Sequence, residues 1–196
     1  RLQGDWSSDV CSSDLSLRQF SQAREYTLFQ VLLAISWTYL ARVCQVDDLA
    51  VTVPIDTRTS DEFQNSVGNF VNTVILRGQF DGNWRFEDIL DQAKERTIEA
   101  IQHSQLPYEK VLQQAACHRD EQGRPALNTM VSLVENTEDI SLGATMCVPM
   151  TLDLQTARFD LGIFFKQHRH GLDLQLEYST EAFSDKRARQ IAEQWL

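Results

Sequence analysis

Four segments of the chain have the hydrophobic pattern of helices. Residues 26–43 are nearly apolar and contain neither Gly nor Pro, which predicts a helix buried on most of its faces. Over residues 86–101, apolar side chains recur every three or four positions between charged ones, as in an amphipathic helix. Pro107 interrupts this pattern and predicts a shorter helix over 108–116, because proline suits the first helical turn. A last helix, preceded by a capping serine, is expected over 185–196.

The remaining apolar runs are short, and they either are rich in β-branched residues or alternate with polar ones, which is typical of strands. The alternation in the later runs indicates a sheet that is covered on one face. The predicted strands span residues 49–55, 70–76, 131–134, 148–154, 159–165 and 172–178, with turns over 78–83 and 167–171. Strands interleaved with helices predict an α/β fold, a mixed β-sheet with helices packed on it.

Composition and charge narrow the possible functions. The chain has 196 residues, of which 42% are hydrophobic and 23% charged, as in ordinary globular domains. Its net charge of −10 argues against nucleic acid or an anionic membrane as a partner, because both repel an acidic protein. The four cysteines are far apart and form no CxxC pair, which argues against a disulfide scaffold or a zinc cluster. They indicate reduced thiols and a cytoplasmic location.

No common catalytic or metal-binding spacing occurs in the sequence. It has no glycine-rich nucleotide motif, no nucleophile elbow and no HExxH pair. None of the four histidines is followed by an Asp four residues later. His168 and His170 lie at a predicted hairpin tip without a carboxylate or cysteine neighbour, which indicates a solvated turn rather than a metal site. The residue pattern alone therefore defines an acidic α/β domain with no predicted metal and no predicted bound cofactor.

Residues 1–15 do not fit this organisation. They show neither a helical nor a strand period, and residues 5–15 match the in-frame translation of a common short-read sequencing adapter. The alternative is a genuine flexible N-terminus, but a match of this length favours an artefact of sequence assembly. We therefore expect the native domain to be residues 16–196 and the natural protein to extend upstream.

Three further segments carry a more specific signal. Residues 67–77 (VGNFVNTVILR) resemble the motif (I/V)GxFVNTxxxR, and residues 103–109 (HSQLPYE) resemble HQDxPFE with departures at Ser104, Gln105 and Tyr108. Residues 119–127 resemble RDxSRNPL with one extra residue. Together, and in this order, they resemble the condensation domains of nonribosomal peptide synthetases. One motif would be weak, whereas several in the family's order are a strong signal over residues 20–196.

This resemblance implies a fold and a reaction. Condensation domains belong to the chloramphenicol-acetyltransferase-like superfamily, in which two half-domains enclose a tunnel, and residues 16–196 correspond to the C-terminal half. The family's catalytic HHxxxDG motif belongs to the N-terminal half and does not occur in this sequence, so no catalytic residue is assigned here. The implied reaction joins aminoacyl and peptidyl thioesters through an amide bond.

The resemblance also implies partners. The substrates hang on phosphopantetheine arms of upstream and downstream peptidyl carrier domains, and the reaction needs neither a metal nor a nucleotide. Without the N-terminal half, the chain is expected to be inactive alone and to expose an apolar face. The alternatives are a non-catalytic half-domain that only binds a carrier protein, and a related acyltransferase or epimerisation-type domain. The sequence FVNT favours ordinary condensation.

Two arginines stand at the ends of predicted strands. Arg58 follows the strand at 49–55, and the resemblance assigns it an ion pair with the Asp of HHxxxDG, which the planar guanidinium suits. The alternative is a solvated loop arginine. Arg77 ends the next strand and is expected to form a structural ion pair.

Polar residues interrupt the apolar strand at 70–76. Asn72 and Thr73 need partners if they are buried, so they are expected either to line the tunnel or to hold the backbone by hydrogen bonds. Gly68 is expected to allow a tight bend or a close approach of the backbone. Phe70 belongs to the same motif.

The second motif has a structural explanation. Pro107 fixes a helix start, and Glu109 lies in its first turn, where a carboxylate suits the helix dipole. A structural role is therefore favoured for His103 over that of a general base, because the family's base lies in the other half. The remaining motif residues are Tyr108, Arg119 and Asp120.

Overall fold

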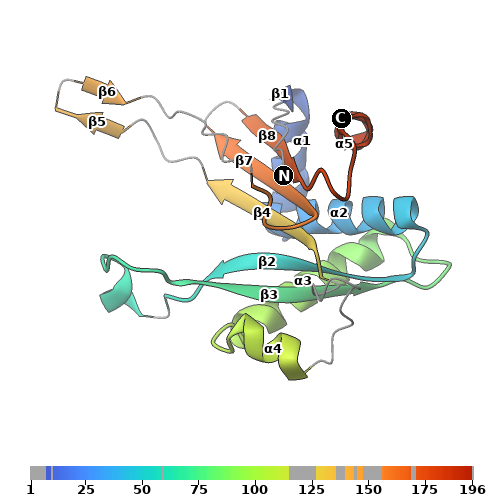
Figure 1. The fold of residues 1–196 in the computed structure, drawn as a ribbon, viewed down its shortest axis with the longest axis horizontal. Helices are drawn as coiled ribbons and strands as arrows, with labels where there is room; N and C mark the ends of the chain where they lie inside the picture. Colours follow the sequence, from blue (N-terminus) through green and yellow to red (C-terminus); the bar gives the residue numbers. More distant parts are fainter. Residues whose placement is uncertain are drawn as a thin grey trace. The chain divides into compact units, whose positions relative to one another are not determined.

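The computed structural model describes residues 8–9, 11–58, 60–114, 127–135, 140–143, 145–147, 156–168 and 171–195. They belong to two units, one formed by Ser21–Val131 and the other by Arg1–Phe20 together with Ser132–Leu196 (Figure 1). Within this described part, no single helix is long and apolar enough to cross a membrane, and only the bent pair Ser16–Ala23 and Leu28–Cys44 reaches that length and composition when taken together.

The first unit is built on a long antiparallel pair of strands. β2 (Asp48–Asp56) and β3 (Val71–Gln79) pair over their full nine-residue lengths. On the other side of β2, the start of β4 (Thr129–Glu135) runs parallel to it, with Thr52 opposite Met130. Parallel and antiparallel neighbours of one strand confirm the predicted mixed sheet.

Two helices pack on these strands and on each other. α2 (Leu28–Cys44) contacts β2, and α3 (Phe86–Gln102) contacts β3. Thr27 starts α2 with a capping box, in which its hydroxyl accepts from the Gln30 N–H while the Gln30 side chain accepts from the Thr27 N–H. The largest fully buried side chains of the unit are Trp37, Leu32, Leu33, Leu76, Ile89 and Leu90.

Two short elements flank the strand pair. A 3-10 turn, η1 (Asp61–Phe63), lies in the loop between β2 and β3, and α4 (Tyr108–Gln114) contacts β3. Figure 1 shows the loop with η1 extending beyond one end of the two strands. This end of the strand pair carries the candidate site.

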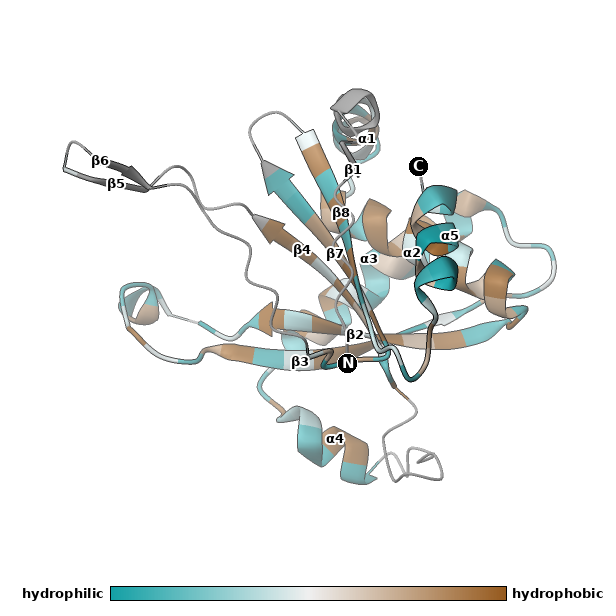
Figure 2. Ribbon diagram, turned by 45° about the horizontal axis from the view of Figure 1, so that its top comes forward, coloured by the Kyte–Doolittle hydropathy of each residue, from teal (hydrophilic) through white to brown (hydrophobic). Residues whose placement is uncertain are grey.

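The second unit contains a hairpin of β7 (Leu161–His168) and β8 (Gly171–Tyr178), which pair along their whole lengths. α5 (Asp185–Trp195) contacts β8, and its mostly hydrophilic colouring in Figure 2 agrees with a narrow apolar face that buries Ala188, Ile191 and Ala192. The other elements of this unit are β1 (Ser8–Asp9), which pairs with β8, and a small hairpin of β5 (Ile140–Leu142) and β6 (Thr145–Cys147). The helix α1 (Cys11–Ala23) belongs to this unit as far as Phe20.

The predicted elements that fall within the described residues occur, with differences at their ends. The turn expected over 78–83 is wrong at its start, because Gly78 and Gln79 still pair with β2 and extend β3. The strand expected from residue 159 begins at Leu161, because the chain bends at Asp160, whose carbonyl accepts from the Ser179 N–H. The hairpin strands reach further than expected, so the loop predicted over 167–171 is shorter.

Some predictions concern residues that the structure does not describe, and others concern the N-terminal segment. The strand predicted over 148–154 and the last two residues of the helix predicted over 108–116 lie outside the described residues. The backbone of residues 8–9 and 11–15 belongs to β1 and α1, an arrangement that the residue pattern does not predict.

Gly78 offers a test of the packing under β3. A β-carbon at this position would lie 2.8 Å from Phe80 Cζ and 2.9 Å from Trp37 Cδ2, and both rings are buried. Gly78→Ala should therefore lower the free energy of unfolding by about 1–3 kcal/mol through overpacking. Gly82→Ala is the matched control, because nothing lies within 4 Å of its β-carbon position. Equal urea-unfolding curves for the two variants would contradict this packing.

Candidate functional site

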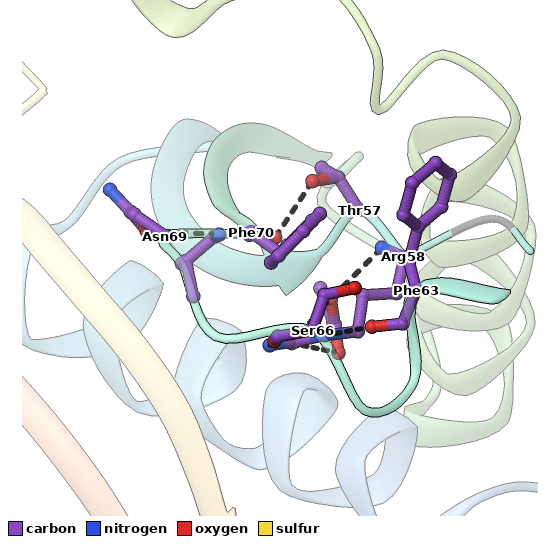
Figure 3. Close-up of polar contacts among 8 residues, drawn as sticks. Thr57, Arg58, Phe63, Ser66, Asn69 and Phe70 are labelled. Carbon is purple, nitrogen blue, oxygen red and sulfur yellow. Dashed lines mark hydrogen bonds and ion pairs between the residues drawn. The ribbon is translucent and has the colours of Figure 1, made fainter.

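The start of β3 brings together residues from the first two motif-like segments. The register of β2 and β3 places Ile55 opposite Asn72. The loop that joins the strands therefore leaves and returns close to Asn72, and Arg58 at its beginning lies over the ring of Phe70 at its end (Figure 3).

Arg58 holds this loop through all three nitrogens of its guanidinium group (Figure 3). Nη1 pairs with the Asp56 carboxylate at 3.1 Å, Nε donates to the Phe63 carbonyl at 3.2 Å, and Nη2 donates to the Ser66 carbonyl at 3.4 Å. The guanidinium carbon lies 4.4 Å from the centre of the Phe70 ring, a cation–π contact. The side chain is only 23% exposed. These contacts do not fit the alternative of a freely solvated loop arginine.

The electrostatic effect of Arg58 falls on its neighbour Asp56. Hydrogen bonds from the Arg58 backbone N–H and then from its side chain hold the pKa of the Asp56 carboxyl below its ordinary value, and the Arg58 charge adds to this. The carboxylate in turn orients the guanidinium toward the two carbonyls of the loop. The pair thus fixes the direction in which the chain leaves β2.

Phe70 closes the loop from its other end. Its carbonyl accepts hydrogen bonds from both the backbone N–H and the hydroxyl of Thr57, each at 2.7 Å. Asn69 Oδ1 accepts from the Val71 N–H at 3.1 Å. A β-carbon at Gly68 would lie 3.2 Å from Phe70 Cε2, so the glycine leaves room for this ring, rather than for another backbone segment.

Asn72 links β3 to the turn between α3 and α4. Its Nδ2 donates to the Ser104 carbonyl at 2.7 Å and to the Leu106 carbonyl at 2.8 Å. Its Oδ1 accepts from the Thr73 N–H at 2.9 Å and from the Tyr108 N–H at 3.3 Å. These contacts are the backbone-holding hydrogen bonds that were one of the two expectations for Asn72.

The segment 103–109 forms the turn that Asn72 holds. Pro107 lies immediately before α4, and its carbonyl accepts the first backbone hydrogen bonds of that helix, as predicted. Glu109 is exposed in the first turn of α4, and His103 is exposed at the C-terminal end of α3. Arg119 and Asp120 lie outside the described residues.

Arg77 lies toward the opposite end of β3. Its guanidinium donates to both carboxylate oxygens of Asp48, which is the ion pair expected from the sequence. The hydrogen bond from Arg77 lowers the pKa of Asp48, and the same hydrogen bond raises the pKa of Arg77. Five steps of extended strand separate Arg77 from Asn72, a distance of about 17 Å. The structure therefore does not bring Arg77 into the cluster at the start of β3.

A pocket of 670 Å³ lies near that far end of the strand pair. Its lining includes Asp47, Phe80, Asp81, Trp84 and Asp88. None of the residues singled out from the sequence lines it, and the hydrophobic pattern contains no signal for it.

The cluster at the start of β3 holds backbone in place. Arg58, Thr57 and Asn72 bind mainly main-chain carbonyl and N–H groups, which every residue type offers. The sequence could therefore point to the polar side chains but not to their partners. Within the described ranges, no group of three or more His, Cys, Asp or Glu side chains could hold a metal ion.

The fold and the family comparison define the class of protein. The condensation domain family model matches residues 6–196, and this chain belongs to the condensation domain family. The first condensation domain of the calcium-dependent antibiotic synthetase, solved with a substrate analogue, superposes with a TM-score of 0.82 over 98% of this chain and 43% of that chain, at 16% identity. A four-domain nonribosomal peptide synthetase bound to AMP and glycine superposes with a TM-score of 0.83 over 97% of this chain and 16% of that chain, at 18% identity.

The similar sequences are large synthetases. Surfactin synthase subunit 2 of Bacillus subtilis (strain 168) is 31% identical over 171 residues, which are 86% of this chain and 5% of that protein. Malpinin synthetase of Mortierella alpina is 28% identical over 179 residues, which are 91% of this chain and 2% of that protein. The chain thus spans only a few per cent of the length of these relatives. The family resemblance expected from the three motif-like segments is confirmed.

Removal of Arg58 should loosen the loop. Arg58→Ala loses the hydrogen bonds to Phe63 and Ser66 and the contact with Phe70, so we expect a loss of about 1–3 kcal/mol in unfolding free energy. Arg58→Lys keeps the charge but cannot reach both carbonyls, and it should fall in between. Arg85→Ala is the control, because that side chain is 78% exposed and pairs with Asp88 at 3.7 Å. Equal urea-unfolding curves for Arg58→Ala and Arg85→Ala would contradict the role of Arg58 in stabilising the loop.

Asp56 should give the loop an acid-sensitive contribution to stability. Because its pKa is lowered in the folded state, the contribution is present above the ordinary carboxyl pKa of about 4 and is lost as the pH falls through the folded value. Thermal melts from pH 6 to pH 3 should show wild type more stable than Asp56→Asn at pH 6, with the difference disappearing at the acid end. A difference that is independent of pH would show that the carboxylate charge does not matter.

Proposed function

We propose that residues 16–196 are the C-terminal half of a condensation domain from a cytoplasmic nonribosomal peptide synthetase, and that residues 1–15 are not native to it. The family match and the order of the motif-like segments support the half-domain assignment. The adapter-like sequence of residues 5–15 supports the exclusion of residues 1–15. The share of a solved condensation domain that the chain covers, 43%, also supports it. The whole domain forms amide bonds between substrates that are bound to carrier domains.

In this reaction, the amine of an aminoacyl thioester attacks the carbonyl carbon of a peptidyl thioester. A carbon–nitrogen bond forms, the carbon–sulfur bond breaks, and the upstream thiol leaves with a proton. Because a thioester is already activated, the domain mainly positions two phosphopantetheine arms and assists proton transfer. The arms belong to upstream and downstream peptidyl carrier domains.

Arg58 carries the proposed link to the active centre. Its contacts with Asp56, Phe63 and Ser66 leave one N–H of Nη2 for a further acceptor. We assign this donor to the Asp of HHxxxDG in the N-terminal half. Arg58 is then a positioning residue, which holds the backbone of the catalytic motif and exchanges no proton with the substrate.

A second candidate is a non-catalytic half-domain that only binds a carrier or another partner protein. The X-domain solved in complex with OxyB from teicoplanin biosynthesis has the same fold, with a TM-score of 0.82 over 97% of this chain at 19% identity. A related acyltransferase or epimerisation-type domain is a third candidate. The FVNT sequence at residues 70–73 favours ordinary condensation over this third candidate. The upstream sequence, which should supply HHxxxDG in a catalytic domain, would distinguish the second.

Complementation tests the proposal. The chain alone, supplied with donor- and acceptor-loaded carrier proteins, should form dipeptidyl thioester only at the uncatalysed rate. Addition of the N-terminal half of a related condensation domain should raise the rate at least about a hundredfold, because it supplies the general base. Mass spectrometry of the thioester product measures both rates.

The control is the same N-terminal half with the second His of HHxxxDG replaced by Ala, which should restore nothing. Turnover by the chain alone would refute the half-domain assignment. A reconstituted, folded domain that binds carriers but makes no product would favour the non-catalytic candidate.

A further inference from the structure

The side-chain amide of Asn72 has no hydrogen-bonding capacity left. An asparagine side chain offers two N–H donors and two acceptor lone pairs. Its nitrogen donates to the carbonyls of Ser104 and Leu106, and its oxygen accepts from the N–H groups of Thr73 and Tyr108. Asn72 cannot bind a substrate amine or carbonyl without giving up a bond to its own chain.

The orientation of this amide is fixed as well. Exchanging its nitrogen and oxygen would set an oxygen against two carbonyl oxygens and an NH₂ group against two N–H donors. Only one orientation therefore satisfies all four neighbours. The partners on the turn lie 32 to 36 residues away in the sequence, so the amide joins two distant segments.

Helix α4 depends on such an attachment. It has seven residues, and none of them is fully buried. A helix of this length is not stable by itself in water, since isolated helices need about 12–15 residues to form even marginally. Asn72 binds the N–H of Tyr108, the first residue of α4, and the carbonyls of Ser104 and Leu106 in the turn that precedes the helix.

We infer that Asn72 is a positioning residue, which holds the turn Ser104–Tyr108, and through it α4, against the start of β3 beside the Arg58 loop. It is not a group that contacts the substrate. The inference rests on the proposed function only for the claim that this region borders the active centre. The hydrogen bonds of Asn72 do not depend on that claim.

Two asparagine-to-aspartate changes test this inference. Asn72→Asp keeps the acceptors but replaces both donors with a carboxylate that faces two carbonyl oxygens. Asn69→Asp is the matched control, because Asn69 lies just before β3 and its side-chain oxygen accepts a hydrogen bond from the Val71 N–H. At pH 7, hydrogen exchange over residues 103–114 should be about tenfold faster or more in Asn72→Asp, and within about twofold of wild type in Asn69→Asp.

Acidification gives a readout that a general loss of packing would not produce. The two carbonyl oxygens should raise the pKa of the carboxyl introduced at residue 72, so it should take up a proton at a higher pH than the carboxyl of Asn69→Asp and then donate one hydrogen bond. The neutral form is favoured by folding, so lowering the pH should stabilise Asn72→Asp relative to wild type. At each pH the comparison is with wild type and with Asn69→Asp, which should show no such recovery.

Equal exchange in the two variants, or no recovery of Asn72→Asp at low pH, would overturn the inference. If Asn72→Asp does not fold at pH 7, the acid measurement decides: refolding supports the inference and continued unfolding refutes it. In the reconstituted domain, amide formation by Asn72→Asp should recover over the same pH range relative to wild type. Failure of wild type to form product would count against the proposed function alone, because the exchange measurement needs no activity.

Discussion

The register of β2 against β3 determines which side chains can meet at the candidate site. The two strands pair over nine residues, and this pairing sets the residue opposite Ile55 as Asn72. A slip by one residue would turn Asn72 to the other face of the sheet and move the two ends of the loop apart. Burial of Val51 and Leu76 under the helices fixes the register, and Gly78 lets the rings of the core approach β3. The geometry of the loop and of the turn therefore depends on this pairing.

The sequence predicts the strands and helices better than their ends. α2 and α3 have long, regular apolar patterns, so the segments at 26–43 and 86–101 were recognisable. β3 continues through Gly78 because of pairing with a distant strand, and a local turn signal cannot reveal that. The cluster itself was visible as polar residues, Arg58 and Asn72, beside or within apolar strands. Their partners were not visible, because a carbonyl at Phe63 or Leu106 is the same in every residue.

Contacts to the main chain also explain how this chain can depart from the family motif. Ser104 and Gln105 differ from the HQDxPFE pattern, yet the turn keeps its attachment because Asn72 binds the carbonyls of residues 104 and 106. This attachment requires a backbone conformation rather than a particular side chain. Pro107, which agrees with the motif, restricts that conformation directly. A substitution at 104 or 105 is therefore compatible with the same geometry, whereas a substitution at 72 is not.

The outer edge of β3 connects these observations. In the described part of the chain, no strand pairs with this edge, and an edge strand presents unpaired N–H groups that invite other strands. Three of these N–H groups, those of Val71, Thr73 and Gln79, donate to side-chain amide oxygens. The acceptors are Asn69, Asn72 and Gln92, respectively. Gln92 also donates to the Gln79 carbonyl at 3.0 Å, as a neighbouring strand would. Asn72 Oδ1 accepts from the N–H groups of both Thr73 and Tyr108. This one atom therefore satisfies an N–H at the strand edge and attaches the turn before α4. β2 pairs with β4 on its other side, whereas the outer edge of β3 pairs with no described strand. The turn before α4 is therefore attached to β3.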